Sequence, residues 1–186
     1  MKRIVSSLTL LLSLTAASQN RVAIFAGPQA STANYSIQNQ KQDTKMKYGF
    51  NAGVAMKVPF DGFLYFAPAA FYSMKGYDVT YNLYNSLPDI NATDNSTRFH
   101  SFEIAALLQF DLSPKPNHIF IKAGPSLDFM LSATEKFNLI SGGSVSRTMK
   151  FGPGEYGRSS ANLLAQLGYE TANGFLIFAQ FTHSPA

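Results

Sequence analysis

Apolar and polar residues alternate with a period of two through most of the chain after residue 20, and this pattern narrows what the chain can fold into. Such alternation is the signature of β-strands whose two faces meet different surroundings. In the clearest segment, Ile119, Ile121 and Leu127 fall on one face, opposite Lys122 and Asp128. No segment of comparable length has a helical period. The alternation predicts seven strands, at residues 21–31, 50–58, 64–77, 102–112, 118–132, 160–170 and 175–183.

The connections between these strands are alternately long and short. Short turns rich in Pro, Gly, Asn and Asp occupy residues 59–62, 113–117 and 171–174. Longer polar connections occupy residues 32–45, 80–97 and 134–158. An up-and-down transmembrane barrel has short periplasmic turns at one end and longer extracellular loops at the other. We therefore predict an all-β fold, an up-and-down antiparallel transmembrane β-barrel with about seven strands present.

The low charge of the chain agrees with a barrel in a bilayer. Only 14% of the residues are charged, against about 25% in ordinary soluble domains. The outer face of a transmembrane barrel meets lipid, so half of each strand has to be apolar. The alternative is a soluble sandwich or lipocalin-like barrel with its apolar face inward. Against it, the polar face is itself poor in charge and rich in small residues, which suit the interior of a small barrel.

Several other classes of protein are disfavoured by the same composition. The chain has no run of about 20 apolar residues, so a helical membrane bundle is not expected. It has no Cys, which removes disulfide scaffolds, Cys-ligated metal sites and thiol nucleophiles. No Lys/Arg cluster along the sequence suggests nucleic acid, and we expect no nucleic-acid partner.

The N-terminus has the pattern of a secretory signal. Basic Lys2 and Arg3 precede a short apolar stretch, and small residues follow up to Ser18. We predict a cleavable signal peptide at 1–18 and an outer-membrane β-barrel domain at 19–186, located in the bacterial outer membrane. Without Lys2 and Arg3, the formal net charge falls from +4 to about +2.

Strand parity directs one set of charged side chains into the barrel. The set consists of Lys57, Lys75, Glu103, Asp111, Lys122, Asp128 and Glu170. Such residues could form a proton path, a pore lining or an active site, but side chains just fill the interior of an eight-stranded barrel. Buried charges also require partners. We expect these residues to form a structural polar network rather than a site of chemistry.

The histidines do not suggest a metal site. His100, His118 and His183 lie on three different strands, without H-x-x-x-H spacing or nearby clusters of Asp and Glu. We predict no metal, no cofactor and no catalytic residue. An outer-membrane hydrolase would need His100 or His183 beside a Ser and a carboxylate at the outer rim, which is the enzymatic alternative.

Several strand motifs are similar to those of a known family. The motifs are Phe25-Ala26-Gly27-Pro28, Gly49-Phe50-Asn51-Ala52-Gly53-Val54, the segment 66–76, Ala123-Gly124-Pro125-Ser126-Leu127 and Phe178-Ala179-Gln180-Phe181-Thr182-His183. With these motifs the chain resembles the PorT-like outer-membrane β-barrel family of Bacteroidetes, small barrels akin to OmpX and the OmpA membrane domain. The resemblance implies eight strands, so the chain is expected to lack the last strand and to be C-terminally truncated.

Together these observations predict a non-enzymatic integral outer-membrane protein. Its partners would be outer-membrane lipid and other proteins of the envelope, contacted through long extracellular loops. The resemblance to PorT implies a part in protein secretion or gliding machinery. The alternatives are an outer-membrane lipid- or peptide-acting hydrolase and a soluble periplasmic lipocalin-like barrel that binds a ligand.

Overall fold

The computed structural model describes residues 21–37, 39–82, 91–152 and 157–184, and the predicted signal peptide lies outside them. This part of the chain is built from β-strands, and none of its segments is a helix long and apolar enough to cross a membrane. The strands are β1 (Arg21–Ser31), β2 (Ser36–Ile37), β3 (Gln40–Lys41), β4 (Asp43–Asp61), β5 (Leu64–Thr80), β6 (Asp94–Asp111), β7 (His118–Asn138), β8 (Ser144–Thr148), β9 (Ser159–Glu170) and β10 (Leu176–His183).

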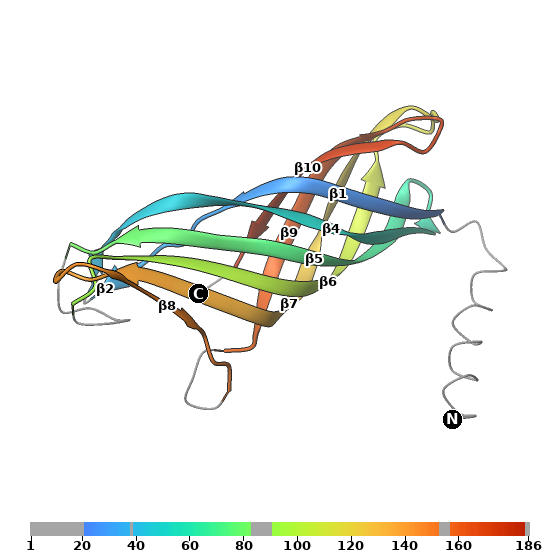
Figure 1. Cartoon of the computed structure of the whole chain (residues 1–186). Helices are drawn as coiled ribbons and strands as arrows, with labels where there is room; N and C mark the ends of the chain where they lie inside the picture. The colour runs from blue at the N-terminus through green and yellow to red at the C-terminus, as the bar shows by residue number, and fades with distance from the viewer. Residues whose placement is uncertain (1–20, 38, 83–90, 153–156, 185–186) are drawn as a thin grey trace, which may run out of the picture.

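Seven of these strands form one continuous antiparallel sheet in the order β1-β4-β5-β6-β7-β9-β10. Strand β8 pairs with the end of β7, and β2 and β3 form a small separate hairpin. The sheet curves strongly around its long axis and forms a half-barrel (Figure 1). The predicted all-β, up-and-down antiparallel architecture with about seven strands is confirmed.

The two edges of this sheet face each other without pairing. Because each neighbour in the sheet is antiparallel, β1 and β10 run in the same direction. Within the described residues, no backbone ladder joins them. Side chains meet across the space instead: the rings of Phe25 and Phe178 pack edge to face with centroids 5.6 Å apart. An antiparallel strand between β1 and β10 would continue both ladders.

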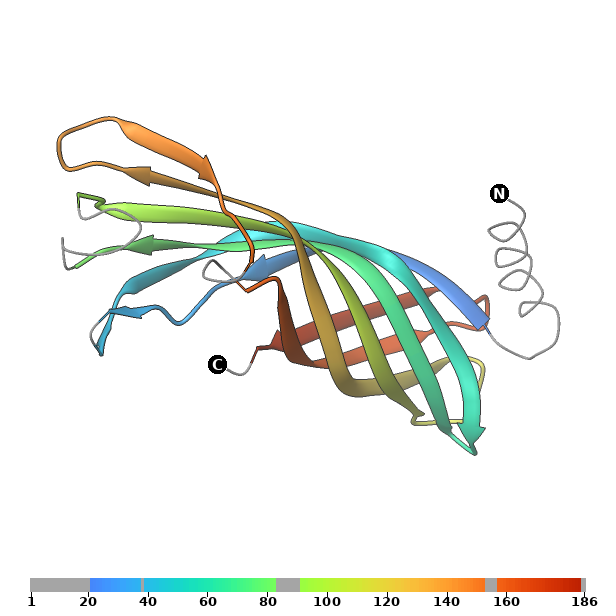
Figure 2. The same cartoon turned by 90° about the horizontal axis from the view of Figure 1, so that it is seen from below.

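The middle strands are longer than the sequence pattern indicated. β4 begins at Asp43, β6 begins at Asp94 and β7 continues to Asn138, so strand occupies parts of the expected long loops. These ends project beyond β9 and β10 as an extension (Figure 2). Polar residues stand on the outer face of the extension, so the apolar alternation that marked the strands fades there. Backbone pairing between β5, β6 and β7 nevertheless continues through it.

The sheet has an apolar outer face and a polar inner face, which is the reverse of a soluble barrel. On β6, Ile104 and Leu108 point outward and are about half exposed, whereas Glu103 and Asp111 point inward and are buried. The same inversion holds on β7, where Leu127 is exposed and Asp128 is fully buried. An apolar exterior around a polar interior is the arrangement of a barrel that stands in lipid.

Two apolar clusters occupy the inner face. The first joins buried residues of β5, β6 and β9, and its largest member is Phe71, which lies opposite Gly53 in the register of β4 and β5. A Cβ at Gly53 would lie 2.3 Å from the Cβ of Phe71, so the absence of a side chain there lets the ring pack inward. The second cluster lies in the extension and includes Val79, Tyr81 and Phe137.

Candidate functional site

The first charged cluster lies inside the sheet at the end where the short turns are. Lys57 on β4 places its Nζ 2.7 Å from Asp111 Oδ2 and 2.7 Å from Glu170 Oε2. His118 Nε2 lies 3.1 Å from the same Asp111 oxygen and 3.4 Å from the same Glu170 oxygen. Arg21 adds a contact of 2.8 Å to the other oxygen of Glu170. We call these five residues the turn-end cluster.

Register explains why residues so far apart in sequence meet here. Arg21 is paired with Lys57 across β1 and β4, and His118 with Glu170 across β7 and β9. Asp111 ends β6, just before the short turn that leads to His118. Curvature of the sheet then brings the inward-facing side chains of these strands together. His118 also hydrogen bonds through Nδ1 to the carbonyl oxygen of Lys115 at 2.9 Å, which fixes its ring.

The turn-end cluster lies beside an open cavity of about 830 Å³. Arg21, Lys57, Asp111 and His118 line it together with residues 59–62 at the end of β4 and residues 113–116 of a short turn. Lys57 also lies over the ring of Tyr65, with its Nζ 4.5 Å from the ring centroid. Water and small ions therefore reach this cluster from the turn end.

The second charged cluster lies further along the interior. Lys75 on β5 forms an ion pair with Asp128 on β7 and lies 3.9 Å from a carboxylate oxygen of Glu103 on β6. The hydroxyl of Ser126 donates to Glu103 at 2.5 Å. Glu103 and Asp128 are opposite each other in the register of β6 and β7, so Lys75 neutralises two neighbouring carboxylates. Almost no water reaches either carboxylate, because both side chains are buried.

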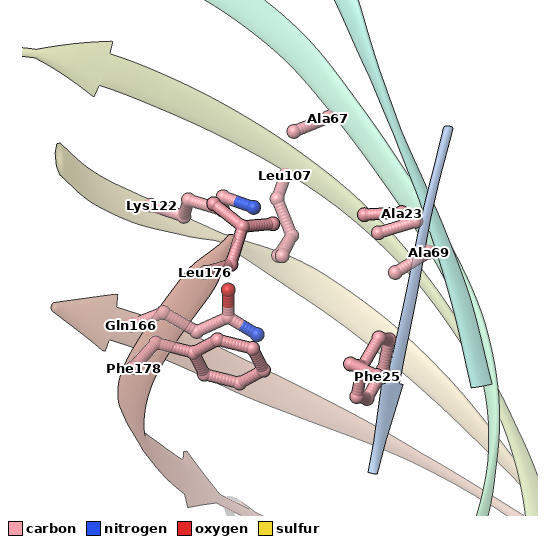
Figure 3. A pocket seen from close by; sticks show the side chains of 10 residues that line it. Ala23, Phe25, Ala67, Ala69, Leu107, Lys122, Gln166, Leu176 and Phe178 are labelled. Carbon is pink, nitrogen blue, oxygen red and sulfur yellow. The ribbon is translucent and has the colours of Figure 1, made fainter. Parts of the chain in front are cut away.

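Lys122 is the member of the predicted set that joins neither cluster. Its ammonium lies 4.7 Å from the centroid of the Phe120 ring, and within the described residues no carboxylate is at ion-pair distance. It lines a small interior cavity with Gln166, Leu107 and Phe178 (Figure 3). The cavity measures about 10 Å³, which is about the space that one water molecule needs. Side chains therefore fill this part of the interior almost completely.

The structure thus groups six of the seven predicted interior residues and adds others that the sequence did not indicate. Arg21, His118 and Ser126 were missed as partners. For His118 the available signal was its position at the start of a strand, where parity directs its side chain inward, as it does for Asp111 and Glu170. That these residues meet follows only from the register of β7 and β9. Sequence spacing alone does not contain that register, because residues 118 and 170 lie on different strands.

The other two histidines lie elsewhere. His100 is on the outer face, where its Nδ1 shares a hydrogen bond with the hydroxyl of Tyr72. Phe50 packs on the other side of Tyr72, with ring centroids 5.4 Å apart. His183 ends β10 and is exposed. Within the described residues, no carboxylate forms an ion pair with His100 or His183.

The donor set of the turn-end cluster has the chemistry of a cation site. Asp111, His118 and Glu170 offer ligand atoms that lie within 4.8 Å of one another. The ammonium of Lys57 occupies the position that a metal would take, since it contacts both carboxylates and lies 3.5 Å from His118 Nε2. The cluster therefore carries its own cation, and a metal would have to displace it.

Comparison with known proteins identifies the family. Residues 9–184 match the family model described as outer membrane protein beta-barrel domain. Neither a curated protein nor a solved structure matches the chain. The match covers every strand of the sheet, and it agrees with the apolar exterior and the charged interior found above. From this match and this fold, we conclude that the chain belongs to the outer membrane protein β-barrel domain family, whose place is the outer membrane.

Proposed function

We propose that this protein is a non-enzymatic outer-membrane barrel with a packed interior, which uses its long strand extension and loops to contact partners at the cell surface or in the envelope. The observation that carries the proposal is the way the inner side chains neutralise one another. Lys57 is held by Asp111 and Glu170, and Lys75 by Glu103 and Asp128. Groups committed to such ion pairs are poor candidates for general acids, bases or nucleophiles.

A packed interior also argues against a pore. The cavity beside Lys122 holds about one water molecule, and the interior apolar cluster around Phe71 and Leu107 lies on the same inner face. We therefore expect no stable ion channel when the purified protein is inserted into a planar lipid bilayer at neutral pH. Stepwise conductance that persists at moderate voltage would contradict this proposal. A porin measured in the same bilayers serves as the positive control.

The hydrolase alternative is tested by direct assay. The protein is incubated in mixed micelles with a phospholipid or a peptide substrate, and product release is compared with that of the His100→Ala and His183→Ala variants. We expect no turnover in any of the three, since no ion pair joins either histidine to a carboxylate in the described residues. Activity that disappears in one variant would establish the enzymatic alternative.

A PorT-like role in secretion or gliding machinery is the finer form of the same proposal. It is supported by the strand motifs and by the extension, which presents strands β5, β6 and β7 beyond the apolar band. The test is deletion of the gene in its own host, followed by measurement of protein secretion. Unchanged secretion, together with normal assembly of other envelope proteins, would leave only a general surface role.

A further inference from the structure

The outer face of β4 to β7 changes from apolar to basic over a short distance. Phe50, Met74 and His100 form one transverse row in the register of β4, β5 and β6. The next row toward the loop end contains Arg98, paired with Gly76. The side chain of Lys47 covers Gly76, since its Cδ would lie 3.0 Å from a Cβ at that glycine.

A second basic row follows directly. Lys45, Asp78, Ser96 and Lys136 lie side by side on β4, β5, β6 and β7. Neighbouring strands are about 4.8 Å apart, so this row is about 14 Å wide. We define the basic patch as Lys45, Lys47, Arg98 and Lys136. Its members come from three strands that are distant in the sequence, β4, β6 and β7, so the sequence alone shows no basic cluster of this size.

Asp78 is the acidic residue within the patch, and among the described residues it forms a close ion pair with Lys47, while the charge of Arg98 also acts on it and Lys45 lies opposite it in register. Lys47 lies 3.0 Å from Asp78 and also hydrogen bonds to Ser96. Lys45, Arg98 and Lys136 are exposed, and none of the ion pairs among the described residues includes them. The nearest acidic residues beyond the patch are in the next row outward, Asp43 and Asp94.

One of those acids is already engaged. Asp94 accepts hydrogen bonds from the backbone N–H and the side-chain amide of Asn138 at 2.9 and 2.8 Å. Asp43 is exposed at the start of β4 and lies one row further from the apolar band than Lys45. The patch therefore keeps an excess of positive charge on the side that adjoins the apolar band.

The height of the patch matches the lipid headgroups. Ten residues of β5 separate Leu64, at the turn end, from Met74 in the last apolar row. At about 3.3 Å per residue and a tilt of about 40°, this segment spans about 25 Å along the membrane normal. That is the height of the apolar band of an outer-membrane barrel. The hydrogen-bonded pair of Tyr72 and His100 stands at its upper limit, where amphipathic rings are found at membrane interfaces.

We propose that the basic patch binds the phosphate of an anionic lipid in the outer leaflet of the outer membrane. The inference rests on the placement of the loop end at the cell surface, as in other barrels with short periplasmic turns. Each Lys or Arg near an anionic lipid surface strengthens binding about fivefold. The patch faces sideways from the barrel wall, directly above the band that contacts acyl chains. A lipid can bind the patch through its phosphate and the apolar band through its acyl chains, because the two parts are covalently joined.

The test uses a single tryptophan as a reporter of neighbouring lipid. The chain has no Trp, and Thr134 is exposed and lies opposite Arg98 in the register of β6 and β7. The full chain carrying Thr134→Trp is inserted into phosphatidylcholine vesicles that contain brominated phosphatidylglycerol or brominated phosphatidylcholine. Quenching of Trp fluorescence gives the relative affinity of the two lipids. We expect phosphatidylglycerol to be favoured about fivefold or more.

A variant and a matched control decide whether the patch causes the preference for phosphatidylglycerol. In the Thr134→Trp background, Lys45→Gln, Arg98→Gln and Lys136→Gln together are expected to bring the affinity ratio of phosphatidylglycerol to phosphatidylcholine to about one. The control combines Lys41→Gln, Lys115→Gln and Lys150→Gln, which removes the same charge from exposed positions outside the patch, and it should keep the preference. An equal loss in the control would mean that net charge alone acts, and the proposal would be wrong.

Other results separate this inference from the proposed function. Resistance of the vesicle-bound protein to extraction by urea shows insertion, and failure to insert would count against the barrel function itself. An inserted protein with equal quenching by both lipids would overturn only the lipid site. If soluble polyglutamate binds in a patch-dependent manner while phosphatidylglycerol shows no preference, the patch serves an acidic protein, and the lipid proposal is again wrong.

Discussion

Arg21 donates a hydrogen bond to Glu170 at 2.8 Å, although 149 residues separate them in the chain. The contact joins β1, at one edge of the sheet, to β9, next to the other edge. The two strands can touch only because the sheet curves strongly. The guanidinium is mostly exposed while the carboxylate is buried, at 70% and 5% of their side-chain surfaces. Water screens such a pair on one side, so it contributes little by itself. Lys57, at 14%, is the more enclosed partner of the same carboxylate.

We predict that Lys57→Met strongly destabilises the protein. The substitution leaves the buried carboxylate of Asp111 without its ammonium, and removing one partner of a buried pair costs about 3–5 kcal/mol. The open cavity and Arg21 favour the lower end of that range. Urea unfolding in detergent micelles, followed by tyrosine fluorescence, measures the free energy. Lys45→Met, at an exposed outer position, is the control and should change it by less than about 0.5 kcal/mol. Equal effects of both variants would contradict a role for the turn-end cluster.

Removal of the Lys57 ammonium should also uncover a cation site. We expect Zn²⁺ to leave the unfolding midpoint of the wild-type protein unchanged and to raise that of Lys57→Ala, because Asp111, His118 and the Glu170 oxygen that does not contact Arg21 can then bind the metal. The double variant Lys57→Ala/His118→Ala should lose the effect of zinc. Stabilisation of the wild-type protein by zinc would show instead that Lys57 does not block the site.

Gly53→Ala is expected to destabilise the sheet by about 1–3 kcal/mol, the usual cost of overpacking. Its methyl group would come 2.3 Å from the carbonyl oxygen of Ala70 and equally close to Phe71 Cβ, so backbone has to move. Gly152→Ala is the matched control, because a Cβ there meets open space. The free energy of unfolding is compared for the two variants. A Gly53→Ala protein as stable as the control would mean that strands β4 and β5 separate easily.

Tyr81 makes the extension sensitive to alkaline pH. Burial above all, and then the neighbouring Tyr35, raise the pKa of the Tyr81 phenol far above its ordinary value of 10.0. A raised pKa in the folded state gives stability that is complete below pH 10 and decreases as the pH rises above it, because the unfolded chain ionises first. Between pH 8 and pH 11 we therefore expect Tyr81→Phe to lose less stability than the wild-type protein. Urea unfolding at both pH values measures this, and parallel losses would contradict the prediction.

The elements were largely predictable because their signal is local. Alternation placed β1 and β9 within a residue of their observed bounds, and the turn 171–174 lies between β9 and β10. The predicted turn 59–62 was wrong in its bounds, because β4 continues to Asp61 through pairing with β5. The ends of β4, β6 and β7 were not predictable in the same way. There the outer face becomes polar, so strand and loop have similar compositions, and only pairing with the neighbouring strand distinguishes them.

The charged interior was predictable residue by residue but not as a set of contacts. Parity alone directs Lys57 and Glu170 to the same face. Their ion pair spans 113 residues and requires the register of every strand between them. The basic patch has the same origin: Lys45 and Lys136 become neighbours in one row only through the pairing of β4 with β5, of β5 with β6 and of β6 with β7.

By itself, the sequence determined that the chain forms strands, which face of each strand is apolar, and that a bilayer suits the product better than water does. These properties depend on residues two positions apart, where the geometry of a β-strand is always the same. Only the tertiary structure decided which charges pair, that His118 joins Asp111 and Glu170, and that cations from three strands form one patch. Those contacts depend on register and curvature, which are properties of the whole sheet and cannot be read from any one strand.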